Sequence, residues 1–398
     1  MADVNKNAIT DVKKLSKGKA LILGLQHAFT MFGATVLVPI LTGLDISVAL
    51  FMAGVCTLIF HVITKFKVPV FLGSSFAFIA PILSVAAIGG ADGLAYARGG
   101  LVVAGLFYCV VALLIYKFGI EKVVSFFPAI VTGPIIMVIG LTLAPTAVNM
   151  AAENWFLAIV SFLVVLIVNI YSKGFLQIIP VITGLIIGYI VAIITGNVDF
   201  TPIMEASWVG LPNFELPKFS LEAILIVAPV AIATVVEHIG DVIAISATVE
   251  KDFMEDPGLH LTMIGDGIGT SLSAMFGGPA NTTYSENTGV LALTGVHDPL
   301  VMRLAAVFAI ILGGVPKLAA LISTIPSAVI GGISIILFGM IASIGARTLV
   351  ENQVDFTKSR NLIIAATILV LGLGGEAVPG GMALAAIIGI VMNKILPE

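Results

Sequence analysis

FGGPANTTYSENTGVLAL (276–293) places a polar run that contains one carboxylate, Glu286, inside apolar sequence. A second stretch, VPVFLGSSFAFIAP (68–81), is interrupted by glycine, serine and proline in the same way. Both are short of the ~20 apolar residues that a continuous membrane helix needs. In hydrocarbon, backbone groups freed by such a break cost several kcal/mol unless protein or cavity water satisfies them. The two stretches therefore predict broken membrane spans around a polar site.

The composition excludes an ordinary soluble protein. Of the 398 residues, 59% are hydrophobic and only 11% are charged, too few charges to cover a solvated surface. The start, MADVNKNAITDVKKLSKGKA, lacks the apolar segment of a cleavable signal peptide. The two cysteines, Cys56 and Cys109, lie in apolar spans and predict neither a disulfide framework nor a metal site. We expect an all-α polytopic membrane protein.

Apolar stretches between polar breaks predict fourteen spans. They are 20–42, 46–64, 69–88, 99–116, 127–147, 155–172, 176–196, 221–245, 259–277, 281–295, 299–322, 325–346, 361–375 and 378–396. With a cytoplasmic N-terminus, this count leaves only Arg98, Lys218 and Lys317 of the nineteen basic residues outside or near an outer boundary. Cytoplasmic loops retain lysine and arginine, so the count predicts that both termini are cytoplasmic.

Seven spans in each half require the halves to have opposite orientations, the geometry of an inverted repeat. We expect a cytoplasmic segment 1–19, a first repeat 20–197, an external loop 198–220 and a second repeat 221–398. LQHAFTMFGA (25–34) aligns with VEHIGDVIAI (236–245), and the two broken stretches stand third in their halves. Breaks in corresponding positions are the best sequence indication of a transporter binding site.

Few ionisable residues fall inside the expected spans. They are His27, His61, Glu237, His238, Asp241, Asp266 and Glu286. Glu237 and Asp241 are four apart and share a helical face, where two carboxylates disfavour joint ionisation and favour a shared proton. His27 and His238 fit either a structural hydrogen bond or a proton relay, and Asp266 fits either a helix bridge or a functional role.

Several motifs resemble one transporter family. ENTGVLALTG (286–295) is similar to the signature of the nucleobase/ascorbate transporters. Other segments resemble the bacterial uracil permeases of that family, namely QHAFTMFGATVLVP (26–39), GSSFAFIAP (73–81), EHIGD (237–241), KDFMEDPGLH (251–260) and NTTYSEN (281–287). The resemblance covers nearly the whole chain.

The resemblance implies a core domain of spans 1–4 and 8–11 and a gate domain of spans 5–7 and 12–14. Broken spans 3 and 10 would each contribute a short β-strand. Substrate residues implied by the motifs are Glu237 and Glu286 on the ring, the backbone amides of Phe76 and Ser285 on its carbonyls, and Asp241, Tyr284, Ala34 and Phe338 around the pocket. The implied proton-coupling residues are Glu237, Asp241, Glu286 and His27.

The resemblance implies proton-coupled uptake of uracil by alternating access across the inner membrane. The pattern NTTYSEN favours uracil, whereas Asp241 stands where uracil permeases usually carry histidine and favours a xanthine or urate symporter. In an anion exchanger of similar architecture, the binding site would need positively charged groups at the breaks. We expect no enzyme activity, metal, nucleic acid or cofactor besides the coupling proton, and a possible partner is a second copy bound through the gate domain.

Overall fold

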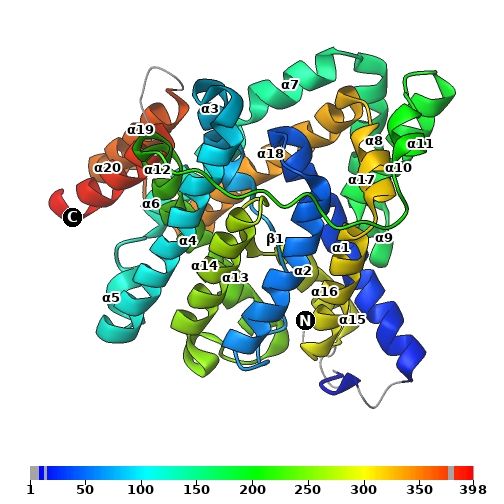
Figure 1. Ribbon diagram of the computed structural model, residues 1–398. Helices are drawn as coiled ribbons and strands as arrows, with labels where there is room; N and C mark the ends of the chain where they lie inside the picture. The colour runs from blue at the N-terminus through cyan, green and yellow to red at the C-terminus, as the bar shows by residue number, and fades with distance from the viewer. Residues whose placement is uncertain (1–8, 13–15, 375–380, 398) are drawn as a thin grey trace.

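The computed structural model describes residues 9–12, 16–374 and 381–397, and these are almost entirely helical (Figure 1). The helices of the first half are α1 Lys17–Thr42, α2 Ile46–Ile63, α3 Ile79–Ile88, α4 Gly93–Phe118, α5 Ile120–Val124, α6 Ala129–Thr142, α7 Ala144–Ala152, α8 Trp155–Tyr171, α9 Phe175–Ile178, α10 Pro180–Ile194 and α11 Thr201–Glu205. Those of the second half are α12 Leu221–Val227, α13 Ala231–Val249, α14 Leu259–Met275, α15 Ser285–Thr294, α16 Leu300–Gly313, α17 Pro316–Ser323, α18 Ser327–Glu351, α19 Ser359–Leu373 and α20 Gly381–Ile395. Strands β1 Leu72–Ser74 and β2 Asn281–Thr283 complete the fold, and both expected strands are confirmed.

Helix boundaries follow local capping chemistry. The Asp45 carboxylate accepts the Val48 N–H at 2.8 Å and begins α2, and Asn154 does the same for Leu157 at α8. Gly43 ends α1 in the left-handed region, with φ of 79°, where a side chain would be strained. Short polar and glycine signals therefore separate apolar stretches that would otherwise run together.

Within the described residues, six helices are long and apolar enough to cross a membrane, or seven if one bent pair counts as a span. Most other expected spans appear as shorter apolar helices such as α8, α10 and α19. The expected span 299–322 is not a single helix, because α16 and α17 meet at 79°. Pro316 begins α17 and cannot donate the backbone hydrogen bond that would continue α16. The expected spans 361–375 and 378–396 lie partly outside the described residues.

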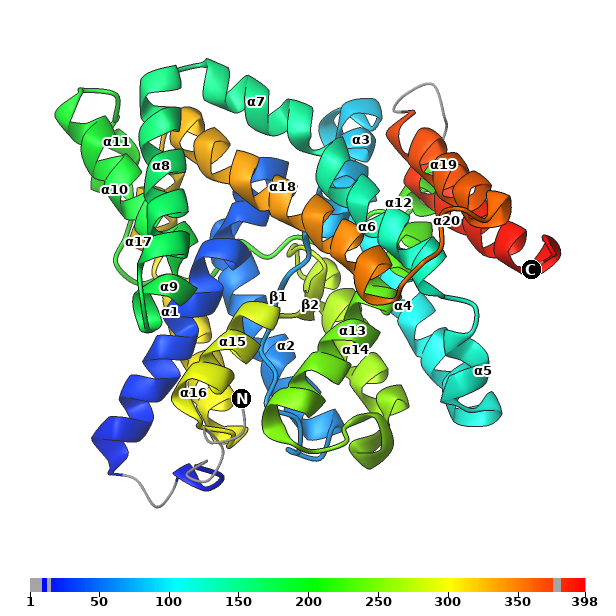
Figure 2. The same cartoon turned by 180° about the vertical axis from the view of Figure 1, so that it is seen from behind.

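The helices pack into two groups. In the first helix group, α14 lies against α2 and α4, and α16 against α1 and α2. In the second helix group, α18 crosses α6, α7 and α8, and α19 packs against α6 and α20 (Figure 2). Glycine allows the closest approaches, since an added Cβ at Gly105 of α4 would come within 2.4 Å of the Gly267 carbonyl oxygen of α14.

The two groups meet along α1 and α15 on one side and α10 and α9 on the other. At this boundary, a Cβ added to Gly33 of α1 would approach Val181 Cγ1 of α10 to 2.9 Å. The small residue lets the two groups touch while space remains beside them for a cavity.

Segment 206–220 runs as an extended chain across the first helix group between α11 and α12 (Figure 1). It is pinned by backbone bonds from Glu215 N to Phe276 O and from Lys218 N to Ala95 O. The three basic residues expected outside all contact this region: Arg98 pairs with Glu215 at 2.7 Å, Lys218 with Asp92 at 2.6 Å, and Lys317 Nζ lies 4.7 Å from the Trp208 ring centre. The three residues therefore gather around one segment of the chain, and their position on the outer side stays a prediction.

Candidate functional site

Two short strands meet at the centre of the first helix group. They pair antiparallel in the register Leu72↔Thr283, Gly73↔Thr282 and Ser74↔Asn281. Each strand leads directly into a helical segment, β1 into the 3-10 turn Phe76–Phe78 and α3, and β2 into α15. The amino ends of both segments therefore lie beside the strand pair, and the first amides of a helix are free to bind acceptor groups.

Neighbouring helices hold the strands through a matched pair of threonines. Thr57 Oγ1 of α2 accepts the Leu72 N–H at 2.9 Å and lies 3.4 Å from the Leu72 carbonyl oxygen. Thr270 Oγ1 of α14 likewise accepts the Asn281 N–H at 3.2 Å and donates to its carbonyl at 2.7 Å. In each strand one hydroxyl therefore bonds the outward-facing backbone groups of one residue, Leu72 or Asn281, which would otherwise be unpaired in an apolar interior.

Tyr284 closes the junction between the strands. Its hydroxyl donates to the Ser74 carbonyl at 3.0 Å and lies 3.4 Å from Thr35 Oγ1 of α1. The ring covers Gly73, where an added Cβ would fall 2.3 Å from Tyr284 Cζ. Tyr284 is therefore a buried element of the strand pair, 5% exposed.

Carboxyl groups gather next to this junction. Thr283 of β2 donates its hydroxyl to Asp241 Oδ2 at 2.7 Å, which ties α13 to the strand pair. Glu237 lies one turn earlier on α13, which packs against α14 with Asp266 and against α15 with Glu286. The four carboxyls come from α13, α14 and α15, and the part of the chain that the structure describes holds no group of His, Cys, Asp and Glu arranged for a metal ion.

Two histidines are buried beside the acidic groups. Asn287 Nδ2 of α15 donates to the His27 carbonyl and lies 3.1 Å from His27 Nδ1. His238 Nε2 lies 3.0 Å from Thr262 Oγ1, and its Nδ1 lies 3.3 Å from Asp266 Oδ2. His27 thus connects α1 to α15, and His238 connects α13 to α14.

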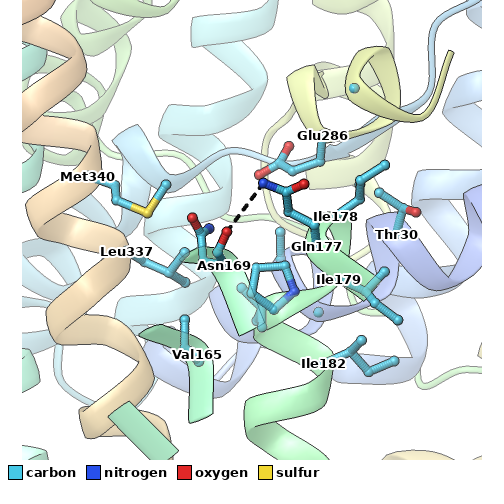
Figure 3. Close-up of a pocket in the computed structure, with 15 residues that line it drawn as sticks. Thr30, Val165, Asn169, Gln177, Ile178, Ile179, Ile182, Glu286, Leu337 and Met340 are labelled. Carbon is cyan, nitrogen blue, oxygen red and sulfur yellow. Dashed lines mark hydrogen bonds between the residues drawn. The ribbon is translucent and has the colours of Figure 1, made fainter. Parts of the chain in front are cut away.

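A cavity of about 230 Å³ lies between the two helix groups (Figure 3). On the side of the first group it is lined by Glu286, Gly289, Thr30, Gly33 and Ala34. The wall from the second group contains two carboxamides, Asn169 and Gln177, among apolar residues of α8, α10 and α18. None of the described residues that line it is basic.

The sequence-predicted residues fall into two sets. Glu286 and Ala34 line the cavity, while Glu237, Asp241, Tyr284, Ser285 and Phe76 surround the strand junction beside it. Phe338 is buried in α18, only 2% exposed, and its neighbours Leu337 and Met340 line the cavity instead.

Sequence reasoning missed the carboxamides of the second wall. Neither residue is ionisable: Asn169 stands in the apolar run FLVVLIVNIY (162–171), and Gln177 stands in the short link after it. An amide within an otherwise apolar span was the signal that could have found the first of them.

Comparison with known proteins gives one consistent result. The family described as "Permease family" (Xan_ur_permease) matches residues 18–381. The chain is 44% identical to the uracil permease of Bacillus caldolyticus, covering 99% of this chain and 96% of that protein. It is also 44% identical to the uracil permease of Bacillus subtilis, covering 94% and 92% respectively.

Among solved structures, the transmembrane domain of the cyanobacterial bicarbonate transporter BicA is similar, with a TM-score of 0.65 and 18% identity over 94% of this chain and 97% of that one. At 18% identity, this similarity shows a shared fold and nothing more. The matching segment, the relatives and the apolar helices agree, so this chain is a multi-pass membrane transporter that belongs to the permease family of xanthine and uracil permeases.

Proposed function

We propose that this protein takes up uracil together with protons. The observation that carries the proposal is the strand pair with two helix amino ends and acidic side chains beside it. Uracil alternates N–H donors with C=O acceptors along its edge. Carboxylates such as Glu237 and Glu286 accept from the N–H groups, and the backbone amides of Phe76 and Ser285 donate to the carbonyls. The names of the relatives, uracil permeases, support the same substrate.

The matched threonines support an inverted repeat in this proposal. Thr57 and Thr270 play the same role toward β1 and β2, and Cys56, next to Thr57, donates to the Gly269 carbonyl next to Thr270 at 3.1 Å. Such reciprocal contacts are expected where a two-fold axis relates two repeats. The first helix group is then the core domain, and the second is the gate domain.

Alternating access would follow from movement of one group against the other. The cavity and the Gly33–Val181 contact both lie at the boundary between the groups. Glu286 and Gly289 are exposed along one face of α15, and Lys173 lies in the turn between α8 and α9. By the distribution of basic residues this end faces the cytoplasm, with both termini on that side of the inner membrane.

Proton coupling would reside in the carboxyl cluster. Glu237 and Asp241 lie one turn apart on one face of α13, and Glu286 stands in the first turn of α15, which packs against α13. Close carboxyls titrate as a coupled set, so loss of a proton from one carboxyl changes the proton affinity of the others. Binding of a ring that donates to Glu237 and Glu286 can therefore be linked to the proton that the cluster holds. His27, bonded to Asn287 beside Glu286, is the remaining candidate in the relay.

Uptake of labelled uracil in a permease-deficient cell tests the substrate. We expect accumulation that unlabelled uracil abolishes and that xanthine, hypoxanthine and adenine leave within twofold. Competition by xanthine rather than uracil would move the assignment to an oxopurine symporter, the alternative that Asp241 favours. Absence of uracil uptake from a correctly inserted protein would refute the proposal.

An anion exchanger fits the site poorly despite the fold it shares with the bicarbonate transporter. Anion sites gather positive charge, whereas Glu286 is the charged residue of this cavity and no lysine or arginine lines it among the described residues. A second copy of the chain, bound through the gate domain in the bilayer, remains the proposed partner.

A further inference from the structure

The cavity has a polar group on each of its facing walls. Glu286 enters it from α15, and Gln177 enters it from α9, the single turn between α8 and α10 (Figure 3). Helix α9 packs directly against α15. Figure 3 shows the two side chains pointing toward one another, so a small ligand between the groups would meet both.

Gln177 is held loosely. Its Nε2 donates to the Asn169 backbone carbonyl at 3.4 Å, which is long for an N–H···O bond. Among the residues that the structure describes, Oε1 of Gln177 receives no hydrogen bond, and the side chain is exposed. Apart from Asn169, the lining near Gln177 is apolar, with Ile178, Ile179 and Pro180. A side chain with unused hydrogen-bonding capacity in an apolar wall can exchange its weak internal bond for a ligand at little cost.

A carboxamide has a specific chemical complement. It presents one acceptor and one donor side by side, and a lactam edge, in which a ring N–H adjoins a C=O, presents the same pair in reverse. The two form a pair of parallel N–H···O=C bonds in one plane. A carboxylate accepts only, so Glu286 can hold a ring N–H but cannot donate to a carbonyl.

We propose that Gln177 contacts the substrate from the gate side and reads one lactam edge of the ring while Glu286 accepts from another N–H. This inference rests on the proposed function for the kind of ligand, and it adds a specificity residue outside the motifs of the core domain. The ring is then held between a residue of each helix group. Movement of one group away from the other removes Gln177 from the ring and weakens binding on the side from which substrate leaves.

The test uses Gln177→Met, which keeps the length of the side chain and removes both hydrogen-bonding groups. Leu176→Ala, at an exposed neighbour outside the cavity lining, is the matched control. Equilibrium binding to the purified full-length protein is measured for uracil, 2-thiouracil and 4-thiouracil. Sulfur is a weak acceptor, so each thio analogue weakens one carbonyl contact with little change in ring size.

We expect Gln177→Met to lower uracil affinity about 3- to 10-fold, the value of about one neutral hydrogen bond. The preference of the wild type for uracil over one of the two thio analogues should fall by a similar factor, and the preference over the other should stay. A residue that only pins α9 to α8 would not change the two preferences unequally. Leu176→Ala should match the wild type in all three affinities.

Uracil affinity within twofold of the wild type, or a loss with both preferences unchanged, would overturn the role of Gln177. Wild-type protein that fails to bind uracil at all would instead overturn the proposed function, so the two failures are distinguishable. The melting temperature of the purified variant and its size-exclusion profile check that it remains folded.

Discussion

At the scale of single residues, the site separates recognition from anchoring. Glu286 is exposed to the cavity, whereas Asp241 is bonded to Thr283 and Tyr284 is bonded to Ser74. A side chain without an internal partner is free to bind a ligand, and a bonded one fixes the geometry around it. Substitutions at the two kinds of residue should therefore have different consequences.

Glu286→Gln should weaken uracil binding about 10- to 150-fold. The change replaces an acceptor-only group with one that also donates, and loss of a hydrogen bond to a charged group costs about 1.5–3 kcal/mol. Isothermal titration of the purified protein measures the effect. Affinity within twofold of the wild type would mean that Glu286 does not touch the ring.

Asp241→Asn should uncouple transport from the proton gradient while substrate binding and counterflow persist. Asparagine can still accept the Thr283 hydroxyl through its Oδ1, so the anchor to β2 survives, but it cannot cycle a proton. Proteoliposomes with and without an imposed pH gradient measure the difference.

The matched control is Thr283→Val, which removes the bond and keeps the carboxyl, and it should retain gradient-driven accumulation. If Asp241→Asn accumulates uracil as steeply with the gradient as the wild type, the proton is carried by Glu237 or His27 instead.

At the scale of elements, the strand pair depends on close packing at β1. Gly73 lies under the Tyr284 ring, and the strands are too short to hold together without Thr57, Thr270 and the tyrosine. Each helix that follows a strand starts where that strand ends, so a shift of the strands would move both helix amino ends.

Gly73→Ala should lower both the melting temperature and uracil affinity. An added methyl would stand 2.3 Å from Tyr284 Cζ, so the ring must move and lose its bonds to Ser74 and Thr35. Overpacking of this kind costs about 1–3 kcal/mol. Gly18→Ala, where no atom lies within 4 Å of the added Cβ, is the control and should match the wild type. Unchanged binding in Gly73→Ala would show that the strand pair does not position the site.

At the scale of the whole molecule, charge is distributed between two ends. Arg98, Lys218 and Lys317 contact segment 206–220 at one end, whereas Arg303 lies over the Phe66 ring and Lys67 pairs with Asp256 near the other. Basic side chains are retained on the cytoplasmic side during insertion. The end that holds Lys67 and Arg303 should therefore face the cytoplasm, because the expected topology assigns to that side every basic residue except Arg98, Lys218 and Lys317.

Single cysteines at Ser207 and Thr357, in a chain without Cys56 and Cys109, test this orientation. Both positions are exposed. A membrane-impermeant maleimide applied to intact cells should label position 207 only, and position 357 should react only after the membrane is opened. External labelling of position 357 would contradict the fourteen-span count.

The resemblance of its motifs to a transporter family implied the two strands, and the sequence by itself determined the membrane class and the boundaries of most helices. These features depend on local properties, namely the length of an apolar run, the cap at its end and the polar break within it. The broken stretches 68–81 and 276–293 were recognisable because unsatisfied backbone in hydrocarbon is too costly to occur without a purpose. The bend of 79° within the expected span 299–322 was not predicted, since hydropathy averages over it.

Only the tertiary structure decided which residues face one another. The register of β1 with β2 joins residues more than two hundred positions apart, and Glu286 meets Gln177 across the two helix groups. Thr57 and Thr270 bond residues only 15 and 11 positions away, but the matched role of the two threonines is visible only in the folded chain. A linear pattern states which face of a helix is polar but not what lies opposite it. The wall formed by Asn169 and Gln177 exists because two packed groups leave a cavity between them, and that packing is a property of the whole fold.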